Sequence, residues 1–433
     1  MKNGGEELSG FGCVAEMKLT PAPCPLPPAP LCLVILLIYC ISFSTAALAE
    51  EITLTPLVDV TAGYDDNVYY SRIIDESDYV ATGRPGFIFD YESELFNVRS
   101  RGSMEILRYL HNSNLNRENY YAFFDGGVKL TERFTLNGNF SFVNDTTLDS
   151  QLEETGIVTF RTDRKRYNGG LEISYGLSEI SSAGFGYNHQ STRYGSDVYE
   201  DYDYDYFRFF WNYAFNDGLD QLTVLPYYGY WRSDVSDVNN YGLSFGFSHA
   251  FSETFSLEVF AGPRYTQTER KYTVSQFAYD PTTGAVNLVL KEMKASDNNW
   301  GGTGSLQVKK RWESSSVTAG YAHELTYNSS IGDDAEPINV DRFYMNATHR
   351  IYRRLGVGFS GSYYISKSAS SFGDQNRRYF TLTPTLNYDI TRNYSLNLTY
   401  SYQRQLYDQS DSDSALDRNR VWITFMWKLP MEW

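Results

Sequence analysis

Cysteine is almost absent from this chain of 433 residues. The four copies, Cys13, Cys24, Cys32 and Cys40, all lie near the amino terminus. The rest of the chain can therefore form neither a disulfide nor a thiolate metal site. This excludes the small disulfide-rich class of secreted domains, and it requires that the fold alone stabilises the protein.

Long hydrophobic runs are also scarce, and the mean hydropathy is −0.42, which excludes a bundle of transmembrane helices. The one apolar run, Leu31 to Ala49, follows Lys18 and ends in Ala47-Leu48-Ala49. A positive start, an apolar middle and a small-x-small end are typical of a secretory signal peptide. Because residues 1–16 carry three glutamates, we predict that translation starts at Met17. We predict a signal peptide over residues 1–49 and one domain over 50–433; a retained membrane anchor is the alternative interpretation.

Sequence motifs of common enzymes are missing. The chain contains no GxxxxGK[ST], HExxH or CxxC sequence, and its five histidines are scattered. Its formal net charge of −16 disfavours binding to nucleic acid. We therefore predict a protein that is not an enzyme, with no cofactor, no metal site and no nucleic-acid partner.

Aromatic residues, by contrast, make up 16% of the chain, and apolar residues recur at every second position. The last thirteen residues show this alternation in Val421, Ile423, Phe425, Trp427, Leu429, Met431 and Trp433. A period of two is typical of a strand whose two faces meet different surroundings. The same pattern, with polar residues between the apolar ones, recurs over 134–142, 380–390 and 394–403. Lipid on one side and water on the other would explain it.

Eighteen segments of this kind follow one another, separated by alternately short and longer connections. We predict an all-β fold, a transmembrane antiparallel β-barrel of about eighteen strands, with sixteen left open, short periplasmic turns and longer extracellular loops. Pro226, Pro263 and Pro384 fall inside strands and predict local bulges. The predicted strands are 52–64, 78–91, 95–110, 119–130, 134–145, 164–177, 181–192, 201–215, 221–233, 239–251, 255–268, 297–312, 315–328, 339–352, 355–367, 377–390, 394–407 and 417–429.

The strand phase turns a set of charged residues toward the interior. A charge facing lipid would cost about 2–4 kcal/mol, so the inward phase is expected. The interior of eighteen strands is too wide for side chains to fill, which favours a channel, or a channel plugged by a loop. Cross-lumen salt bridges that merely fill the barrel are the alternative. The predicted lumen-facing residues are Arg99, Arg101, Glu105, Asp125, Lys129, Glu172, Arg208, Glu258, Arg264 and Asp389.

The longest predicted loop, 269–296, has an alternating pattern of its own around Asp280-Pro281-Thr282-Thr283-Gly284. We interpret it as a hairpin that either extends above the membrane or folds into the mouth of the barrel.

Both ends of the predicted barrel resemble known sequences. The aromatic carboxyl terminus resembles the terminal recognition signal of bacterial outer-membrane barrels. The resemblance implies an assembly signal at Phe425, Trp427, Leu429 and Trp433 and the barrel-assembly machinery as a partner.

The opening segment, Pro56-Leu57-Val58-Asp59-Val60 through Gly63-Tyr64-Asp65-Asp66-Asn67-Val68, resembles the start of β-barrel porins associated with exopolysaccharide secretion. That resemblance implies a porin in a Gram-negative outer membrane, surrounded by lipid and lipopolysaccharide, that serves polysaccharide export together with periplasmic export proteins. A diffusion porin for the uptake of small hydrophilic solutes is the alternative, and a barrel-wall hydrolase or an adhesin is a third interpretation.

Overall fold

The computed structural model describes residues 51–433 apart from 156–157, 159–160, 280–281, 283–285, 330–335, 372–375 and 408–413. The predicted signal peptide lies outside the described residues. The described residues belong to one compact unit.

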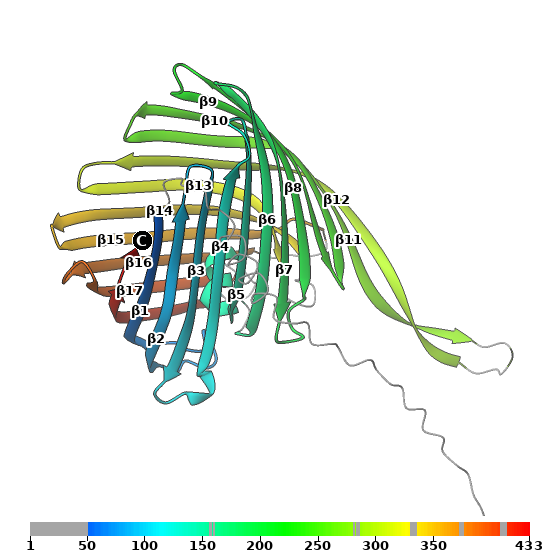
Figure 1. Ribbon diagram of the computed structural model, residues 1–433. Coiled ribbons are helices and arrows are strands. Elements are labelled where there is room, and N and C mark those ends of the chain that lie inside the picture. The colour runs from blue at the N-terminus through cyan, green and yellow to red at the C-terminus, as the bar shows by residue number, and fades with distance from the viewer. Residues whose placement is uncertain are drawn as a thin grey trace, which may run out of the picture. The chain divides into compact units, whose positions relative to one another are not determined.

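Eighteen antiparallel strands, each paired with the next along the chain, form the barrel (Figure 1), as predicted. The first half comprises β1 Glu51–Asp65, β2 Asp78–Glu92, β3 Phe96–Tyr109, β4 Arg117–Lys129, β5 Phe134–Thr146, β6 Asp163–Ser178, β7 Ser181–Tyr194, β8 Tyr202–Phe215 and β9 Asp220–Ser233. The second half comprises β10 Ser236–Ser252, β11 Phe255–Tyr279, β12 Val286–Arg311, β13 Ser315–Asn328, β14 Glu336–Tyr352, β15 Leu355–Ser368, β16 Asn376–Asp389, β17 Tyr394–Tyr407 and β18 Ser414–Lys428. A two-residue segment, β19 Met431–Glu432, continues β18.

Among the residues that the structure describes, helical structure is confined to short segments in two connections, η1 Ser113–Leu115, η2 Thr147–Gln151 and α2 Leu152–Thr155. None of the helices in the described ranges has the length and apolar character needed to cross a membrane.

The two ends of the chain close the barrel. Strand β1 pairs with β2 on one side and with β18 on the other, from Leu57 opposite Lys428 to Asp65 opposite Arg420. The pairing continues to the carboxyl terminus, where the Trp433 amide donates to the Ile52 carbonyl at 2.9 Å. Closure gives the backbone groups of both terminal strands partners, which a barrel in lipid requires.

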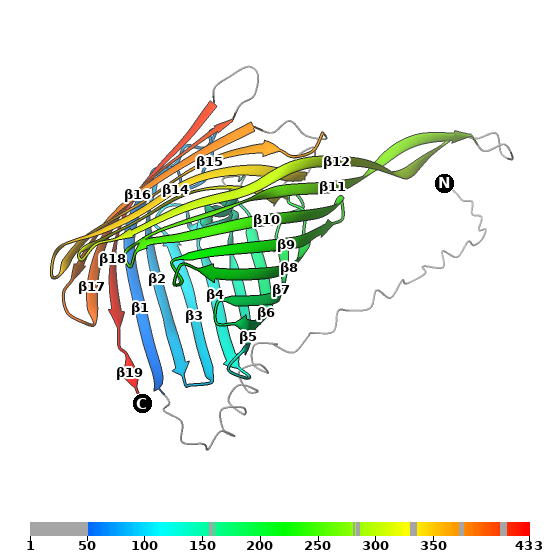
Figure 2. The ribbon, with the colours of Figure 1, turned by 90° about the horizontal axis from the view of Figure 1, so that it is seen from above.

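The structure changes the bounds of two predicted connections, and it confirms the hairpin predicted within residues 269–296. The connection between β9 and β10 is only residues 234–235, and the predicted loop 269–296 is mostly strand. Strands β11 and β12 continue as a hairpin that pairs only with itself beyond Arg270 and before Gly304 (Figures 1 and 2). Charged side chains of the two strands form cross-strand pairs, such as Lys294 Nζ with Glu269 Oε1 at 2.6 Å. The hairpin therefore extends outward and does not fold into the mouth.

The strand prolines do not produce bulges. At Pro384 the pairing between β16 and β17 is interrupted from Leu382 to Thr385, yet the register is the same on both sides of the gap. The same holds at Pro263 between β10 and β11. Proline has no N–H to donate, so one neighbouring ladder loses bonds while the other continues. The bulge prediction is therefore wrong.

Candidate functional site in the barrel interior

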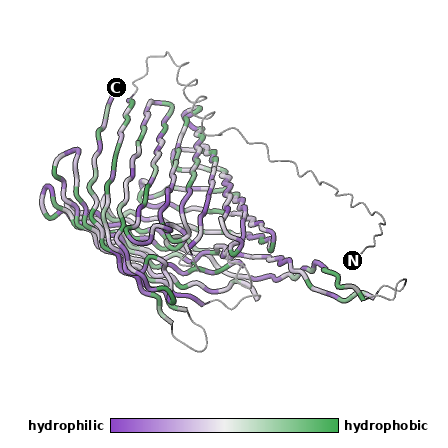
Figure 3. Tube along the Cα trace, turned by 90° about the horizontal axis from the view of Figure 1, so that it is seen from below, coloured by the Kyte–Doolittle hydropathy of each residue, from purple (hydrophilic) through white to green (hydrophobic). Residues whose placement is uncertain are grey.

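Cross-strand pairing determines which side chains share a face of the sheet, because residues directly opposite each other point the same way. Hydropathy alternates along the strands accordingly (Figure 3). Two adjacent rows of opposed residues cross strands β2 to β8 on the inner face. The first row is Asp90, Arg99, Asp125, Asn139, Gly170, Asn188 and Tyr206. The second row is Glu92, Asn97, Gly127, Asn137, Glu172, Gly186 and Arg208.

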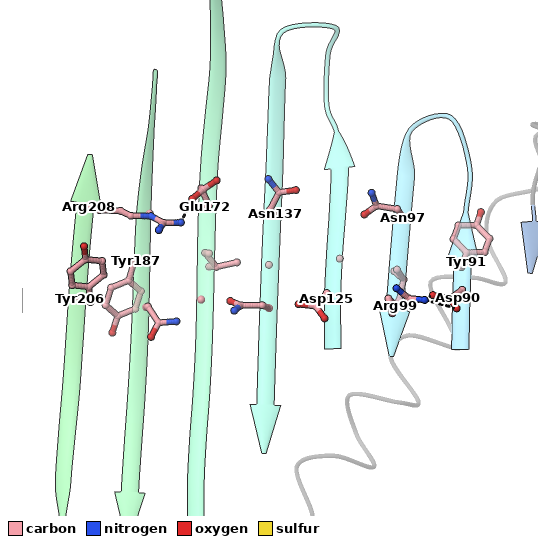
Figure 4. A pocket seen from close by; sticks show the side chains of 18 of the residues that line it. Asp90, Tyr91, Asn97, Arg99, Asp125, Asn137, Glu172, Tyr187, Tyr206 and Arg208 are labelled. Atoms are coloured by element: carbon pink, nitrogen blue, oxygen red, sulfur yellow. Dashed lines mark hydrogen bonds and ion pairs between the residues drawn. The ribbon is translucent and has the colours of Figure 1, made fainter. Parts of the chain in front are cut away.

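All residues of these two rows except Gly127 line a cavity of about 860 Å³, which we call the amide chamber (Figure 4). An ion pair lies at each end of it. Arg99 Nε contacts Asp90 Oδ1 at 2.8 Å, and Arg208 pairs with Glu172 from two strands away. All four side chains are more than a quarter exposed, so water screens both pairs. Between the pairs, the chamber presents neutral amide side chains together with one carboxylate, Asp125.

Of the predicted lumen-facing residues, only some lie close together. Arg99, Asp125, Glu172 and Arg208 line the amide chamber, and Glu105 lines a second cavity. The remaining ones are dispersed: Arg101 lies over the Phe123 ring, Arg264 Nη2 donates to Asn339 Oδ1 at 2.6 Å, and Lys129, Glu258 and Asp389 stand on β4, β11 and β16.

A loop folds into the barrel from the connection between β5 and β6. Its apolar side chains Leu148, Leu152 and Val158 are almost completely buried. They pack in one cluster with side chains from the β1–β2 connection and from the wall β14 to β18, namely Tyr70, Ile338, Val340, Tyr364, Tyr379 and Leu416. The sequence predicted this segment as an extracellular loop. The structure shows that this connection folds into the interior, where its apolar residues find apolar partners.

Polar contacts attach the same loop to opposite walls. On β4, Arg117 Nη2 donates to Asp149 Oδ1 at 2.6 Å. On β7, the Tyr194 hydroxyl donates to Gln151 Oε1 at 3.1 Å. On β15, Ser366 Oγ donates to the Thr155 carbonyl at 3.4 Å. Because η2 and α2 are held from both sides, the loop narrows the interior.

A second cavity of about 330 Å³ lies between this loop and strands β18 and β1 to β4. Its lining contains four carboxylates and four arginines, most of them in ion pairs. Arg418 Nε contacts Asp65 Oδ1 at 3.0 Å, and Arg84 pairs with Glu105. The lining is charge-balanced: Asp59, Asp65, Glu105 and Asp149 against Arg84, Arg117, Arg418 and Arg420.

Sequence reasoning missed the amides of the chamber and the role of Asp149. The amides alternate along β5 as Asn137 and Asn139, which is also the pattern of a solvated strand face. Asn97 and Asn188, the other two amides of the chamber, belong to other strands, so the proximity of the four amides depends on the register of the sheet. A signal for the inward loop was present in Leu148 and Leu152, two apolar residues in a segment predicted as extracellular.

The five histidines stand on different strands or connections, and each contacts one aspartate or serine side chain. Four histidines contact an aspartate and one a serine, as in His189–Asp205 at 2.9 Å and His349–Ser315 at 2.8 Å. One Gly-x-Ser-x-Gly sequence, Gly242 to Gly246, lies within strand β10, without the strand-to-helix turn that presents a nucleophilic serine. Among the described residues, no group of three or more His, Cys, Asp or Glu side chains could hold a metal ion.

Neither a protein-family model nor a curated protein sequence matches the chain. Among solved structures, it is similar to Pseudomonas aeruginosa OpdK with vanillate, with 10% identity, a TM-score of 0.42 and coverage of 88% of this chain and 99% of the other. It is also similar to P. aeruginosa OccK9 (OpdG), with 12% identity, a TM-score of 0.42 and coverage of 87% of this chain and 98% of the other. For the ferric citrate transporter FecA in its unliganded form, the identity is 8%, the TM-score is 0.46, and the coverage is 89% of this chain and 80% of the other. At these identities the likeness extends to the barrel fold alone.

Proposed function

We propose that this protein is an outer-membrane channel through which small hydrophilic solutes diffuse. The observation that carries the proposal is the combination of a closed barrel with a charged and amide-lined interior, narrowed by the inward loop. Cavities of about 860 and 330 Å³ match the volumes that hold small molecules in proteins. Polar walls let such a solute exchange its hydration shell for protein contacts at little cost.

We place solute uptake ahead of polysaccharide export because of the inward loop. A polymer needs a continuous wide path, and the loop is attached to both β4 and β15. Export would require that the buried cluster around Leu152 separate at every passage.

The membrane setting is part of the proposal. The outer-facing residues of β18 include Ile423 and Phe425, both substantially exposed, as expected for a lipid-facing surface. We propose that lipid and lipopolysaccharide cover this surface, and that Phe425, Trp427, Leu429 and Trp433 act as the assembly signal.

Two experiments test the proposal. Purified protein in planar bilayers should conduct ions, and proteoliposomes should swell in small sugars or amino acids but not in large dextrans. In a deletion strain, uptake of a small solute should fall while surface polysaccharide stays unchanged. A loss of polysaccharide with normal uptake would favour export instead, and absence of conductance in a folded protein would reject a channel altogether.

A further inference from the structure

Glycines in the amide chamber stand between long polar side chains. In the second row Gly127 lies between Asn97 and Asn137, and in the first row Gly170 lies between Asn139 and Asn188. Neighbouring strands are about 4.8 Å apart, so the two amides on either side of a glycine strand can meet above it.

The glycines are needed for this approach. A Cβ atom at Gly127 would lie 2.8 Å from Asn97 Oδ1 and 2.7 Å from Asn137 Oδ1. A Cβ atom at Gly170 would overlap Asn139 Oδ1 and lie 3.0 Å from Asn188 Nδ2. Each glycine therefore forms the floor beneath a converging pair of amides.

The amides concerned are Asn97, Asn137, Asn139 and Asn188. In the part of the chain that the structure describes, none of their side chains makes a hydrogen bond to another protein group. Asn97, Asn137 and Asn139 are also exposed to the cavity. Each amide offers both an acceptor oxygen and an NH₂ donor, so the chamber presents mixed hydrogen-bonding capacity across two rows.

This mixture matches hydroxyl groups better than ions. A hydroxyl both donates and accepts, whereas an anion needs donors alone and a cation needs acceptors alone. The arginines at the chamber ends already have carboxylate partners, Asp90 and Glu172, so they attract an anion weakly. Tyr206, directly opposite Asn188, adds an aromatic face on which the C–H side of a sugar ring can lie.

From these observations we propose that the amide chamber is a binding site for a neutral polyhydroxylated solute, a mono- or disaccharide. This proposal rests on the proposed channel function and deepens it. The chamber volume of about 860 Å³ lies in the range of small-ligand pockets. Several neutral hydrogen bonds of modest strength would hold the sugar briefly, which conduction requires.

The test measures how maltose reduces the ion current through the purified channel in planar bilayers. Maltose should lower the current in a saturable way, whereas polyethylene glycol of similar size should lower it only in proportion to concentration. The double variant Asn137→Ala/Asn139→Ala should weaken maltose binding about tenfold or more, since each lost hydrogen bond accounts for roughly two- to tenfold. The matched control is Asn397→Ala, an amide on β17 outside the chamber, which should bind maltose normally.

A second variant separates position from polarity. Gly170→Ala keeps every amide but forces Asn139 and Asn188 apart, so it should also weaken maltose binding in a normally folded, conducting barrel. Heat-modifiable migration on gels confirms folding for each variant.

The outcomes distinguish this inference from the channel proposal. A conducting channel that maltose does not affect, or variants that bind it as tightly as wild type, would overturn the sugar site and leave the channel in place. Block by a cationic solute such as spermidine but not by maltose would identify the chamber as acidic instead, with the lining carboxylates Asp125 and Glu92 responsible. A folded protein without conductance would remove both proposals.

Discussion

Replacing Leu152 by alanine should open the channel. The Leu152 side chain is 0% exposed and lies within the cluster that joins the inward loop to the wall β14 to β18. Removing a buried leucine side chain costs about 2–5 kcal/mol. Even the lower figure shifts the ratio of attached to detached loop by roughly 30-fold. Because Leu152 belongs to no strand, this cost falls on the loop and not on the barrel.

The assay is single-channel conductance in planar bilayers at fixed salt. The variant should conduct more than wild type and show noisier currents, because a detached loop samples the lumen. Leu290→Ala is the control, since Leu290 lies in the projecting hairpin and is 67% exposed. The converse experiment joins cysteines at Thr155 and Ser366 with a thiol-specific crosslinker, which should hold conductance at its low value.

An unchanged conductance in folded Leu152→Ala protein would refute the view that the loop narrows the path. A loss of heat-modifiable barrel would instead mean that the loop is needed for folding. Leu148→Ala, in the same cluster, then provides an independent test with another side chain.

Three further predictions follow from other features. Burial raises the pKa of the Asp149 carboxyl, but the Arg117 guanidinium and hydrogen bonds from Thr146 outweigh it and lower the pKa overall. The contact between Asp149 and Arg117 is therefore fully present above the ordinary carboxyl pKa of about 4, and it is lost as pH falls through the lowered pKa. Conductance should therefore rise only in strong acid. A pH-independent conductance, or the same acid response in Asp149→Asn, would contradict this. Deleting Leu429 to Trp433 should abolish heat-modifiable protein in outer membranes; normal amounts would count against the assembly signal. A cysteine at Phe277, which is 75% exposed, should react with an impermeant reagent on whole cells while one at Glu253 should not; the reverse pattern would invert the topology.

The sequence alone was sufficient to predict the barrel, but it was not sufficient to predict how the interior is arranged. Alternation such as Tyr394, Leu396 and Leu398 is local information, and the lipid-facing requirement fixes its phase, so the eighteen strands could be predicted. The inward loop could not be predicted, because Leu152 packs in one cluster with Ile338 and Tyr364, which are far away along the chain. Long-range packing of this kind has no sequence period.

The amide chamber could not be predicted from the sequence for a related reason. Gly127 and Gly170 are unremarkable as strand glycines until the register places an asparagine on each side. Predicting that arrangement would require the alignment of three strands to within one residue, since a slip of one residue moves every side chain to the other face.

The short ladder between β12 and β13 has a mechanical consequence. These strands pair over only eight residues, Gly304 to Arg311, whereas β11 and β12 pair over 25. The contact that joins the two ends of the chain is longer, with nine pairs to β18 and two to β19. If the barrel is pulled apart by force, the tear should therefore begin between β12 and β13 and not at the junction of the chain ends. The barrel would then open into one continuous sheet, with β13 at one torn edge and β12, with the long hairpin, at the other.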